Sequence, residues 1–289
     1  MKFLKIISSS FHERGVREHS SLTGNPLGFY AHSQKYTSEE DIIKLLKFHL
    51  DFEEKIGAGF SQDILIVSSN SKEFTKGEAY LNSLENKEIN GGKILIMLRE
   101  NIGYSFGAFN AGFQKFQDDY DFFIFQEDDL FTHIPDYLKK AIDIWNKSEN
   151  CGFVPFIAST KVGRSHRKAL NIKKNEIVSC HGGHGMSSAK VLKHVTKEFG
   201  SLAYNSKDSQ EYIDHLREGE IMFTYTIKLL GYEFGEIPKE IMFNAPALDI
   251  MRGIKIRKYP NTAERIFYYL ELFSKKPFVE ILRYLNFYK

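Results

Sequence analysis

A run of apolar residues that ends in three consecutive carboxylates limits what this chain can fold into more than any other segment. The run Phe122–Phe125 leads through Gln126 into Glu127, Asp128 and Asp129. Strands buried on both faces of a parallel sheet have continuous apolar sequences of this kind. Acids that follow such a strand lie at the carboxyl edge of the sheet, where open α/β folds bind ligands. Neighbouring carboxylates repel one another unless a cation lies between them. The segment therefore predicts a metal site, with a solvated acidic turn as the alternative.

Predicted strands and helices alternate along the first half of the chain. The strands cover residues 3–7, 63–67, 93–98 and 122–125, and the serine-rich stretches 8–10 and 68–71 are predicted to be turns. Helices are predicted from residue 38 and over 106–116. The first of them carries an apolar stripe at helical spacing, which comprises Ile42, Leu45, Leu46, His49 and Leu50. This order predicts an α/β fold in which helices flank a mostly parallel sheet.

In the first half, residues 11–36 are polar and aperiodic and are predicted to form a long loop. The second half of the chain is less regular. Strands are predicted over 153–158, 177–180 and 232–237, and helices over 187–199 and 220–230. Gly231 is a suitable residue to end the last helix. Because neither a repeat nor a low-complexity linker occurs, a single domain is expected.

Bulk properties exclude several classes of protein. The chain has 289 residues, 42% of them hydrophobic, and a formal net charge of +2, which gives no electrostatic argument for nucleic acid binding. Cys151 and Cys180 form no disulfide framework and no CxxC pair, which indicates a reducing compartment. The apolar stretch at the start is too short for a signal peptide or a membrane span. We therefore expect a cytoplasmic protein.

The segment from Asn101 to Gly112 joins a predicted strand to a predicted helix. Its small residues allow close approach by a ligand, and the helix N-terminus offers backbone N–H groups to a phosphate. The glycine spacing matches neither the dinucleotide fingerprint nor the phosphate loop of nucleotide triphosphatases. The alternative is close packing of the helix on the sheet through Gly107, Ala108 and Gly112.

With these two segments the chain resembles nucleotide-sugar glycosyltransferases of the GT-A fold, especially family 2. The resemblance lies in Asn101-Ile102-Gly103, in Asn110-Ala111-Gly112, and in Glu127-Asp128-Asp129 at the place of an Asp-x-Asp motif. It implies a Rossmann-like GT-A domain over 1–245, with a donor-binding half at about 1–130 and an acceptor half over 131–245. It also implies Mg²⁺ or Mn²⁺ on the donor diphosphate, held by Asp129 with Glu127 as a second ligand.

A third part of the resemblance lies in residues 217–232. The family pattern opens a helix with acidic residues and ends it in a glycine, which places Glu220 at the position of the general base in inverting members. Glu218 is the competing candidate. A carboxylate at a helix N-terminus is held ionised by the helix dipole, which suits a base. The alternative is that Glu220 only stabilises the first turn of its helix.

The glycine-rich loop after Cys180 occupies the acceptor side of the cleft in the resembled family. Its candidate acceptor-binding residues are His181, Gly182, Gly183 and His184. Two histidines three residues apart can also ligate a metal, and a plain loop is the third interpretation.

Strand ends and the following turns supply the candidate donor-binding residues. They are Ser8, Ser69, Asn70, Arg99, Asn101, Gly103, Asn110, Glu127 and Asp128. The family usually has an acidic residue after the second strand, where this chain has Ser69 and Asn70. Recognition of the nucleotide base by that acid is therefore not expected here.

Residues 246–289 alternate basic and aromatic side chains and predict a helical extension. The part from 265 to 289 is suited to the surface of a bilayer, at the inner face of the membrane. Packing on the catalytic domain or on a second subunit in a homodimer is the alternative.

The resemblance implies a metal-dependent glycosyltransferase that moves a sugar from a nucleotide-diphosphate donor to a hydroxyl of a glycan or lipid-linked glycan. Inversion at the anomeric carbon is expected, in polysaccharide or glycoconjugate synthesis. A nucleotidyltransferase acting on sugar phosphates is the second enzyme class, although the Ser8-Ser9-Ser10 segment lacks its glycine-rich basic loop. A catalytically decayed glycan-binding or assembly protein is the non-enzymatic alternative, because Glu127 replaces the first aspartate of the motif.

Overall fold

The fold is known from a computed structural model. It describes residues 1–11, 39–70, 75–157, 159–161, 167–168, 170–173, 177–180, 183–204, 215–235 and 244–246. The long loop predicted after the first strand and the extension predicted after residue 246 lie outside these residues. So do His181 and Gly182.

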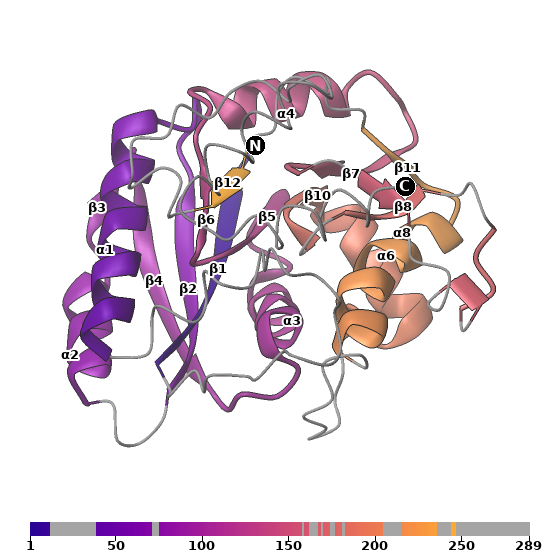
Figure 1. The fold of residues 1–289 in the computed structure, drawn as a ribbon. Coiled ribbons are helices and arrows are strands. Elements are labelled where there is room, and N and C mark those ends of the chain that lie inside the picture. Colours follow the sequence, from indigo (N-terminus) through magenta and orange to yellow (C-terminus); the bar gives the residue numbers. More distant parts are fainter. Residues whose placement is uncertain are drawn as a thin grey trace, which may run out of the picture.

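An eight-stranded, mixed and mostly parallel sheet forms the centre of the structure, with the strand order β11-β7-β10-β5-β1-β2-β4-β3 (Figure 1). Four parallel neighbours make up its middle: β1 (Phe3–Phe11), β2 (Asp63–Asn70), β4 (Gly92–Arg99) and β5 (Phe122–Glu127). The short strand β3 (Glu88–Ile89) runs antiparallel to β4. On the other side, β10 (Gly185–Ser188) lies antiparallel between β5 and β7 (Cys151–Pro155), and β11 (Glu233–Phe234) is parallel to β7. The predicted α/β fold with a mostly parallel sheet is confirmed.

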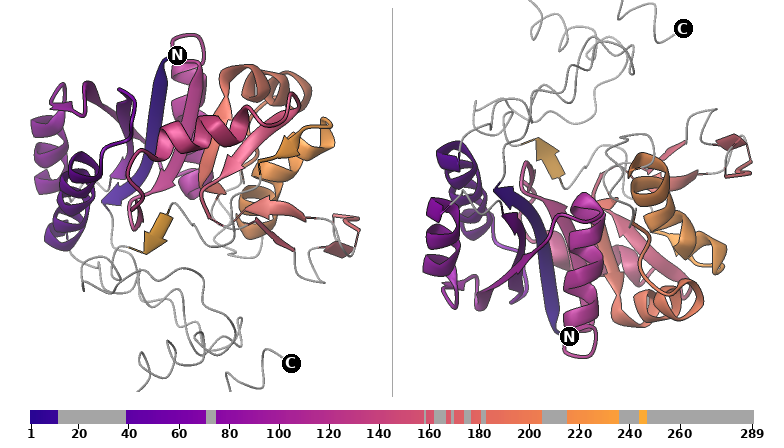
Figure 2. Two further views of the ribbon diagram at one scale, coloured as in Figure 1. Left: turned by 90° about the horizontal axis from the view of Figure 1, so that it is seen from above. Right: turned by 90° about the horizontal axis from the view of Figure 1, so that it is seen from below.

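Helices cover both faces of this sheet because its strands are apolar on both sides. Along β1, Phe3 and Ile7 pack on the face that carries α1, α2 and α4, whereas Leu4 and Ile6 pack on the face that carries α3, α6 and α8. The helix bounds are α1 (Glu39–Ile56), α2 (Thr75–Leu84), α3 (Tyr104–Phe116), α4 (Tyr137–Trp145), α6 (Ala189–Phe199) and α8 (Met222–Leu229). Figure 2 shows α4 in front of the sheet in one view and α3 in front of it in the opposite view.

The predicted serine turns are wrong, because both serine-rich stretches continue their strands. Residues 8–10 belong to β1 and pair with residues 67–69 of β2, and Ser8 also pairs with Glu127 of β5. Serine has low strand propensity, but pairing with the neighbouring strand β2 overrides that preference. The two strands therefore reach beyond the end of β5.

Several elements of the second half were not predicted. Gly185–Ser188 was assigned to a loop and to the start of a helix, but it forms β10 in the main sheet, and α6 begins one residue later, at Ala189. The hydroxyl of Ser188 caps this helix by accepting a hydrogen bond from the backbone N–H of Val191 at 3.3 Å. This strand has only four residues, and one glycine and two serines are among them, so its sequence shows no strand pattern.

Two small sheets lie beside the main one. β8 (Ser159–Lys161) pairs with β9 (Ile177–Cys180), and β6 (Leu130–Thr132) pairs antiparallel with β12 (Asn244–Pro246). Figure 1 shows β12 next to β6, which follows directly on the acidic residues. The chain thus returns to this region about 115 residues later, at the place where the sequence predicted a domain boundary. Among the described residues, no helix is both long enough and apolar enough to cross a membrane.

Candidate active site at the carboxyl edge of the sheet

The three acids form a turn at the carboxyl end of β5, as the sequence predicted. We call Glu127, Asp128 and Asp129 the acidic turn; it leads from β5 into β6. The neighbouring parallel strands end at the same edge of the sheet. This edge is the place where open α/β sheets bind their ligands.

The three carboxylates of the acidic turn differ in their exposure. Asp128 is 3% exposed, and its Oδ2 accepts a hydrogen bond from the Ser9 hydroxyl at 2.8 Å. Glu127 is 33% exposed, and its Oε2 lies 3.3 Å from Nε2 of the buried His184. Asp129 is partly exposed. Asp128 therefore anchors the turn to β1, while the other two acids offer carboxylate surface to a ligand.

Residues 99–107 connect β4 to α3 through a compact turn. Gly103, the N-cap residue, has φ 75°, a left-handed conformation that favours glycine, and Tyr104 follows with φ 51°. The guanidinium of Arg99 donates a hydrogen bond from Nη2 to the carbonyl of Ile102 at 2.6 Å, and burial lowers the pKa of this side chain. Arg99 thus stabilises the turn that precedes the first helical residues of α3.

The small residues of α3 serve helix–sheet packing, which was the alternative interpretation of this segment. A Cβ atom on Gly112 would lie 3.0 Å from Ile6 and from Leu65 of the sheet. The Asn110 side chain accepts a hydrogen bond from the backbone N–H of Leu202 at 2.9 Å, which joins α3 to the loop after α6. This contact is structural, and the donor-binding role of Asn110 stays a prediction.

Gly107→Ala should lower the stability of the protein and displace the turn before α3. A Cβ atom at this position would lie 1.9 Å from the carbonyl oxygen of Ile102, which is a backbone atom and cannot rotate away. We expect a loss of about 3 kcal/mol in the free energy of unfolding, measured by urea denaturation. Gln114→Ala, on the exposed side of the same helix, is the control and should change the stability little. An unchanged free energy for Gly107→Ala would contradict the described turn.

Phe106 at the start of α3 brings three predicted segments together. A Cβ atom on Gly183 or on Gly219 would lie 2.8 Å from its ring, and the ring of Phe223 in α8 packs on it at a centroid distance of 5.5 Å. His184, next to Gly183, contacts Glu127 of the acidic turn. The helix N-terminus, the histidine loop and the segment with Glu218 and Glu220 therefore meet on one side of the sheet edge.

The prediction that Glu220 opens a helix is wrong. A π-helical segment, η4 (His215–Ile221), precedes α8 and continues into it, because Ile221 already has helical dihedral angles. Glu218 lies in the first turn of η4, and Glu220 lies two residues further along. Single-turn π-helices occur frequently at functional sites.

The remaining donor-binding candidates follow the same edge of the sheet. Ser8 pairs with Glu127, Ser69 is buried and pairs with Arg99, and Asn70 ends β2. Asn101 is exposed in the turn after β4. These positions line up across the strands, but their roles in binding stay predictions.

A buried polar network behind the acidic turn was not predicted. Lys5, His49 and Glu53 are 0–1% exposed, and the Lys5 ammonium lies 2.6 Å from the Glu53 carboxylate. Two sequence signals could have indicated it. Lys5 interrupts an apolar strand, and Glu53 follows His49 at four residues on the apolar stripe of α1, where charged side chains are almost never buried unpaired.

Glu127 and Asp129 fit a particular kind of metal site. Carboxylate oxygens suit Mg²⁺ and Mn²⁺, and Mg²⁺ is commonly bound by one or two carboxylates together with waters and substrate phosphates. Within the described part of the chain, no group of three or more His, Cys, Asp or Glu side chains could hold a metal ion. Glu127 and Asp129 are carboxylates of the kind that such a cation uses.

Comparisons with known proteins find similarity to solved structures. A scan against protein-family models finds no match, and a search of the curated proteins finds none. Among solved structures, the chain is similar to residues 1–349 of S. aureus TarS, with 13% sequence identity over 99% of this chain and 78% of that chain and a TM-score of 0.44. It is also similar to a cytidylyltransferase from Leptospira borgpetersenii serovar Hardjo-bovis (strain JB197), with 12% identity over 84% of this chain and 78% of that chain and a TM-score of 0.43. Neither similarity assigns an activity to the chain.

Proposed function

We propose that this protein is a metal-dependent glycosyltransferase that uses a nucleotide-diphosphate sugar. The observation that carries the proposal is the meeting of four segments at one edge of the sheet. The acidic turn, the start of α3, the loop with His184 and the segment η4 come together there through Phe106 and through the contact between His184 and Glu127. A site for a diphosphate donor and an acceptor hydroxyl needs these parts: carboxylates for a cation, backbone N–H groups for phosphate, and a base.

The acidic turn is the proposed site of the donor diphosphate. Asp129 and Glu127 would hold Mg²⁺ or Mn²⁺, and the bound cation would neutralise charge on the leaving diphosphate. His184 orients the carboxylate of Glu127 from the buried side. Asp128 does not reach the ligand in this proposal, because its carboxylate is bonded to Ser9 and only 3% exposed.

Deprotonation of the acceptor hydroxyl is assigned to a carboxylate of η4. Glu218 and Glu220 are both partly exposed, and Gly219 between them packs on Phe106 beside the donor side of the site. Glu220 remains the first candidate for this base, and Glu218 the competing one. A base on the acceptor side, opposite the leaving group, gives a product with inverted anomeric configuration, which NMR of the product checks.

A thermal-shift screen of UDP- and GDP-sugars with and without Mn²⁺ tests the proposal. A donor at 100 times its dissociation constant should add about 2.7 kcal/mol of stability, and the melting temperature should rise only when Mn²⁺ is present. Slow hydrolysis of the same nucleotide sugar should accompany the shift. The nucleoside monophosphate is the matched control, because it lacks the diphosphate that the cation holds.

Two further assays, of pyrophosphate release and of glycan binding, separate the rival functions. Release of pyrophosphate from a nucleoside triphosphate in the presence of a sugar phosphate would identify a nucleotidyltransferase. Binding of a glycan without any shift or hydrolysis by nucleotide sugars would identify a binding protein. Either result would overturn the proposed function.

A further inference from the structure

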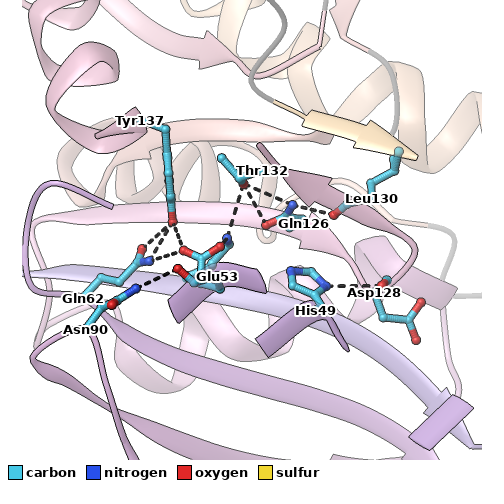
Figure 3. Close-up of polar contacts among 10 residues, drawn as sticks. His49, Glu53, Gln62, Asn90, Gln126, Asp128, Leu130, Thr132 and Tyr137 are labelled. Atoms are coloured by element: carbon cyan, nitrogen blue, oxygen red, sulfur yellow. Dashed lines mark hydrogen bonds and ion pairs between the residues drawn. The ribbon is translucent and has the colours of Figure 1, made fainter. Parts of the chain in front are cut away.

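The buried network behind the acidic turn is centred on Glu53 of α1 (Figure 3). Its Oε1 accepts hydrogen bonds from the amide of Gln62 and from the hydroxyl of Tyr137, each at 2.6 Å. Its Oε2 pairs with the ammonium of Lys5 at 2.6 Å, and its backbone carbonyl accepts a hydrogen bond from Asn90 at 2.8 Å. The network thus ties α1 to β1, to α4 and to the loops that precede β2 and β4.

The network continues to both ends of the acidic turn. From Lys5 it passes to the Thr132 hydroxyl at 3.4 Å, and from there to the amide of Gln126 at 3.2 Å. The amide of Gln126 also donates to the carbonyl of Leu130. Gln126 immediately precedes the acidic turn and Leu130 immediately follows it, so this amide closes the turn from behind (Figure 3).

His49 holds the middle of the acidic turn. Its Nδ1 lies 3.2 Å from the backbone carbonyl of Asp128, and its ring packs on Phe131 at a centroid distance of 4.5 Å. A carbonyl oxygen only accepts hydrogen bonds, so Nδ1 carries the proton. Burial, and next the charge of Lys5, lowers the pKa of His49 to about 3, which leaves the ring neutral with an unprotonated Nε2.

Stability alone is a weak explanation for so many buried polar groups. Apolar residues of similar volume often replace a buried ion pair without loss of stability. What a hydrogen-bonded polar network adds is one fixed arrangement of the groups that it joins. Here its contacts reach Gln126, the carbonyl of Asp128 and the carbonyl of Leu130, which flank Glu127 and Asp129 in the chain.

We propose that His49, together with the Lys5–Glu53 pair and Gln126, positions the acidic turn so that Glu127 and Asp129 hold their carboxylates toward the ligand. The inference rests on the proposed function for the identity of that ligand. None of these positioning residues touches the donor. Each acts through the backbone of residues 126–130.

Two substitutions of His49 separate the hydrogen bond from the packing of the ring. His49→Phe keeps an aromatic ring against Phe131 but removes the donor to the carbonyl of Asp128, whereas His49→Asn keeps an N–H donor near the position of Nδ1. Hydrogen–deuterium exchange of peptides covering 126–132 is measured without metal or donor. We expect exchange about tenfold faster in His49→Phe and close to wild type in His49→Asn.

Catalysis supplies the second readout. Donor hydrolysis by His49→Phe should fall about 10- to 100-fold in kcat with a smaller change in KM, as for residues that orient metal ligands indirectly. His194→Phe is the matched control, because it removes a histidine contact to Tyr232 far from the acidic turn. If His49→Phe does not fold, Thr132→Val removes the link between Lys5 and Gln126 at nearly constant volume and should give the same faster exchange.

The two proposals can fail separately. Unchanged exchange over 126–132 in both His49→Phe and Thr132→Val would overturn the positioning role, whatever the activity. The wild-type protein could also fail to bind or hydrolyse nucleotide sugars while His49→Phe still shows the expected faster exchange over 126–132. The positioning role would then stand. That result would instead overturn the proposed function.

Discussion

Asp129→Ala is expected to reduce metal-dependent hydrolysis and transfer on the order of 10³-fold, because a cation held on the leaving diphosphate contributes several kcal/mol to the transition state. Asp129 is partly exposed at the end of the turn that contains the buried Asp128. Its removal takes away a ligand without opening a cavity. We therefore expect the loss in kcat/KM with little change in melting temperature, measured on the same preparation.

Two further variants make the result for Asp129 specific. Asp143→Ala removes an exposed carboxylate on α4 and should leave the activity unchanged. Glu127→Gln should lower the activity and raise the Mn²⁺ concentration needed for half-maximal activity, since Glu127 is the second proposed ligand. If Asp129→Ala retained wild-type kcat/KM at saturating Mn²⁺, the assignment of the metal site to the acidic turn would be wrong.

Lys5→Met is expected to cause the largest loss of stability. The substitution leaves the Glu53 carboxylate buried without its cation, and removal of one partner of a buried pair costs about 3–5 kcal/mol. Urea denaturation measures the loss. The double variant Lys5→Met with Glu53→Gln should recover much of it, because glutamine keeps an acceptor for Gln62 and Tyr137 and carries no charge. A double variant as unstable as Lys5→Met alone would contradict this account.

The pH dependence of stability reports on the same pair. Burial raises the pKa of Glu53, but Lys5 and the hydroxyl of Tyr137 outweigh it, so that the net pKa lies below 4.5. The unfolded chain then binds the proton more tightly than the native protein. The stabilisation is fully present above pH 4.5 and is lost as the pH falls through the lower, native pKa. Glu53→Gln should remove this part of the acid sensitivity, which denaturation at pH 3 to 7 measures.

The same rule predicts that stability also rises with pH in alkali, through Lys5. Burial lowers the pKa of Lys5 below 10.5 despite the charge of Glu53. Between the native pKa and 10.5 the unfolded chain binds more protons, so this group makes stability rise with pH across that window. Lys5→Met should lack this rise.

The middle of the sheet was predictable because each of its strands carries a continuous apolar run, and helical patterns were predicted in two of the three connections; α2 (Thr75–Leu84) was not predicted. Residues of β2, β4 and β5 that the sequence assigned to strands are in those strands. The end of β1 was not predictable, because it lacks such an apolar run. Serines 8–10 have no strand preference of their own, and pairing with β2, together with β5 at Ser8, keeps them extended.

The candidate site was predictable in its parts and not in its arrangement. Sequence placed the acids at the end of a strand and glycines before a helix, and both lie there. It could not assign different roles to Asp128 and Glu127, because their side chains point to opposite faces of the sheet and meet different partners. Nor could it show that residues 215–221 form the π-helical segment η4, since a π-helical turn has no simple residue pattern.

The sequence by itself determined a parallel α/β core and an acidic turn at its carboxyl edge, because hydrophobic periodicity and strand order are local properties of the chain. The tertiary structure alone decided which acid faces solvent, which glycines surround Phe106, and why Lys5 is buried in β1. Those features depend on partners 48 to 127 residues away in the chain, such as Glu53 and Thr132 for Lys5. Folding brings these partners within hydrogen-bond distance, and no local pattern encodes that distance.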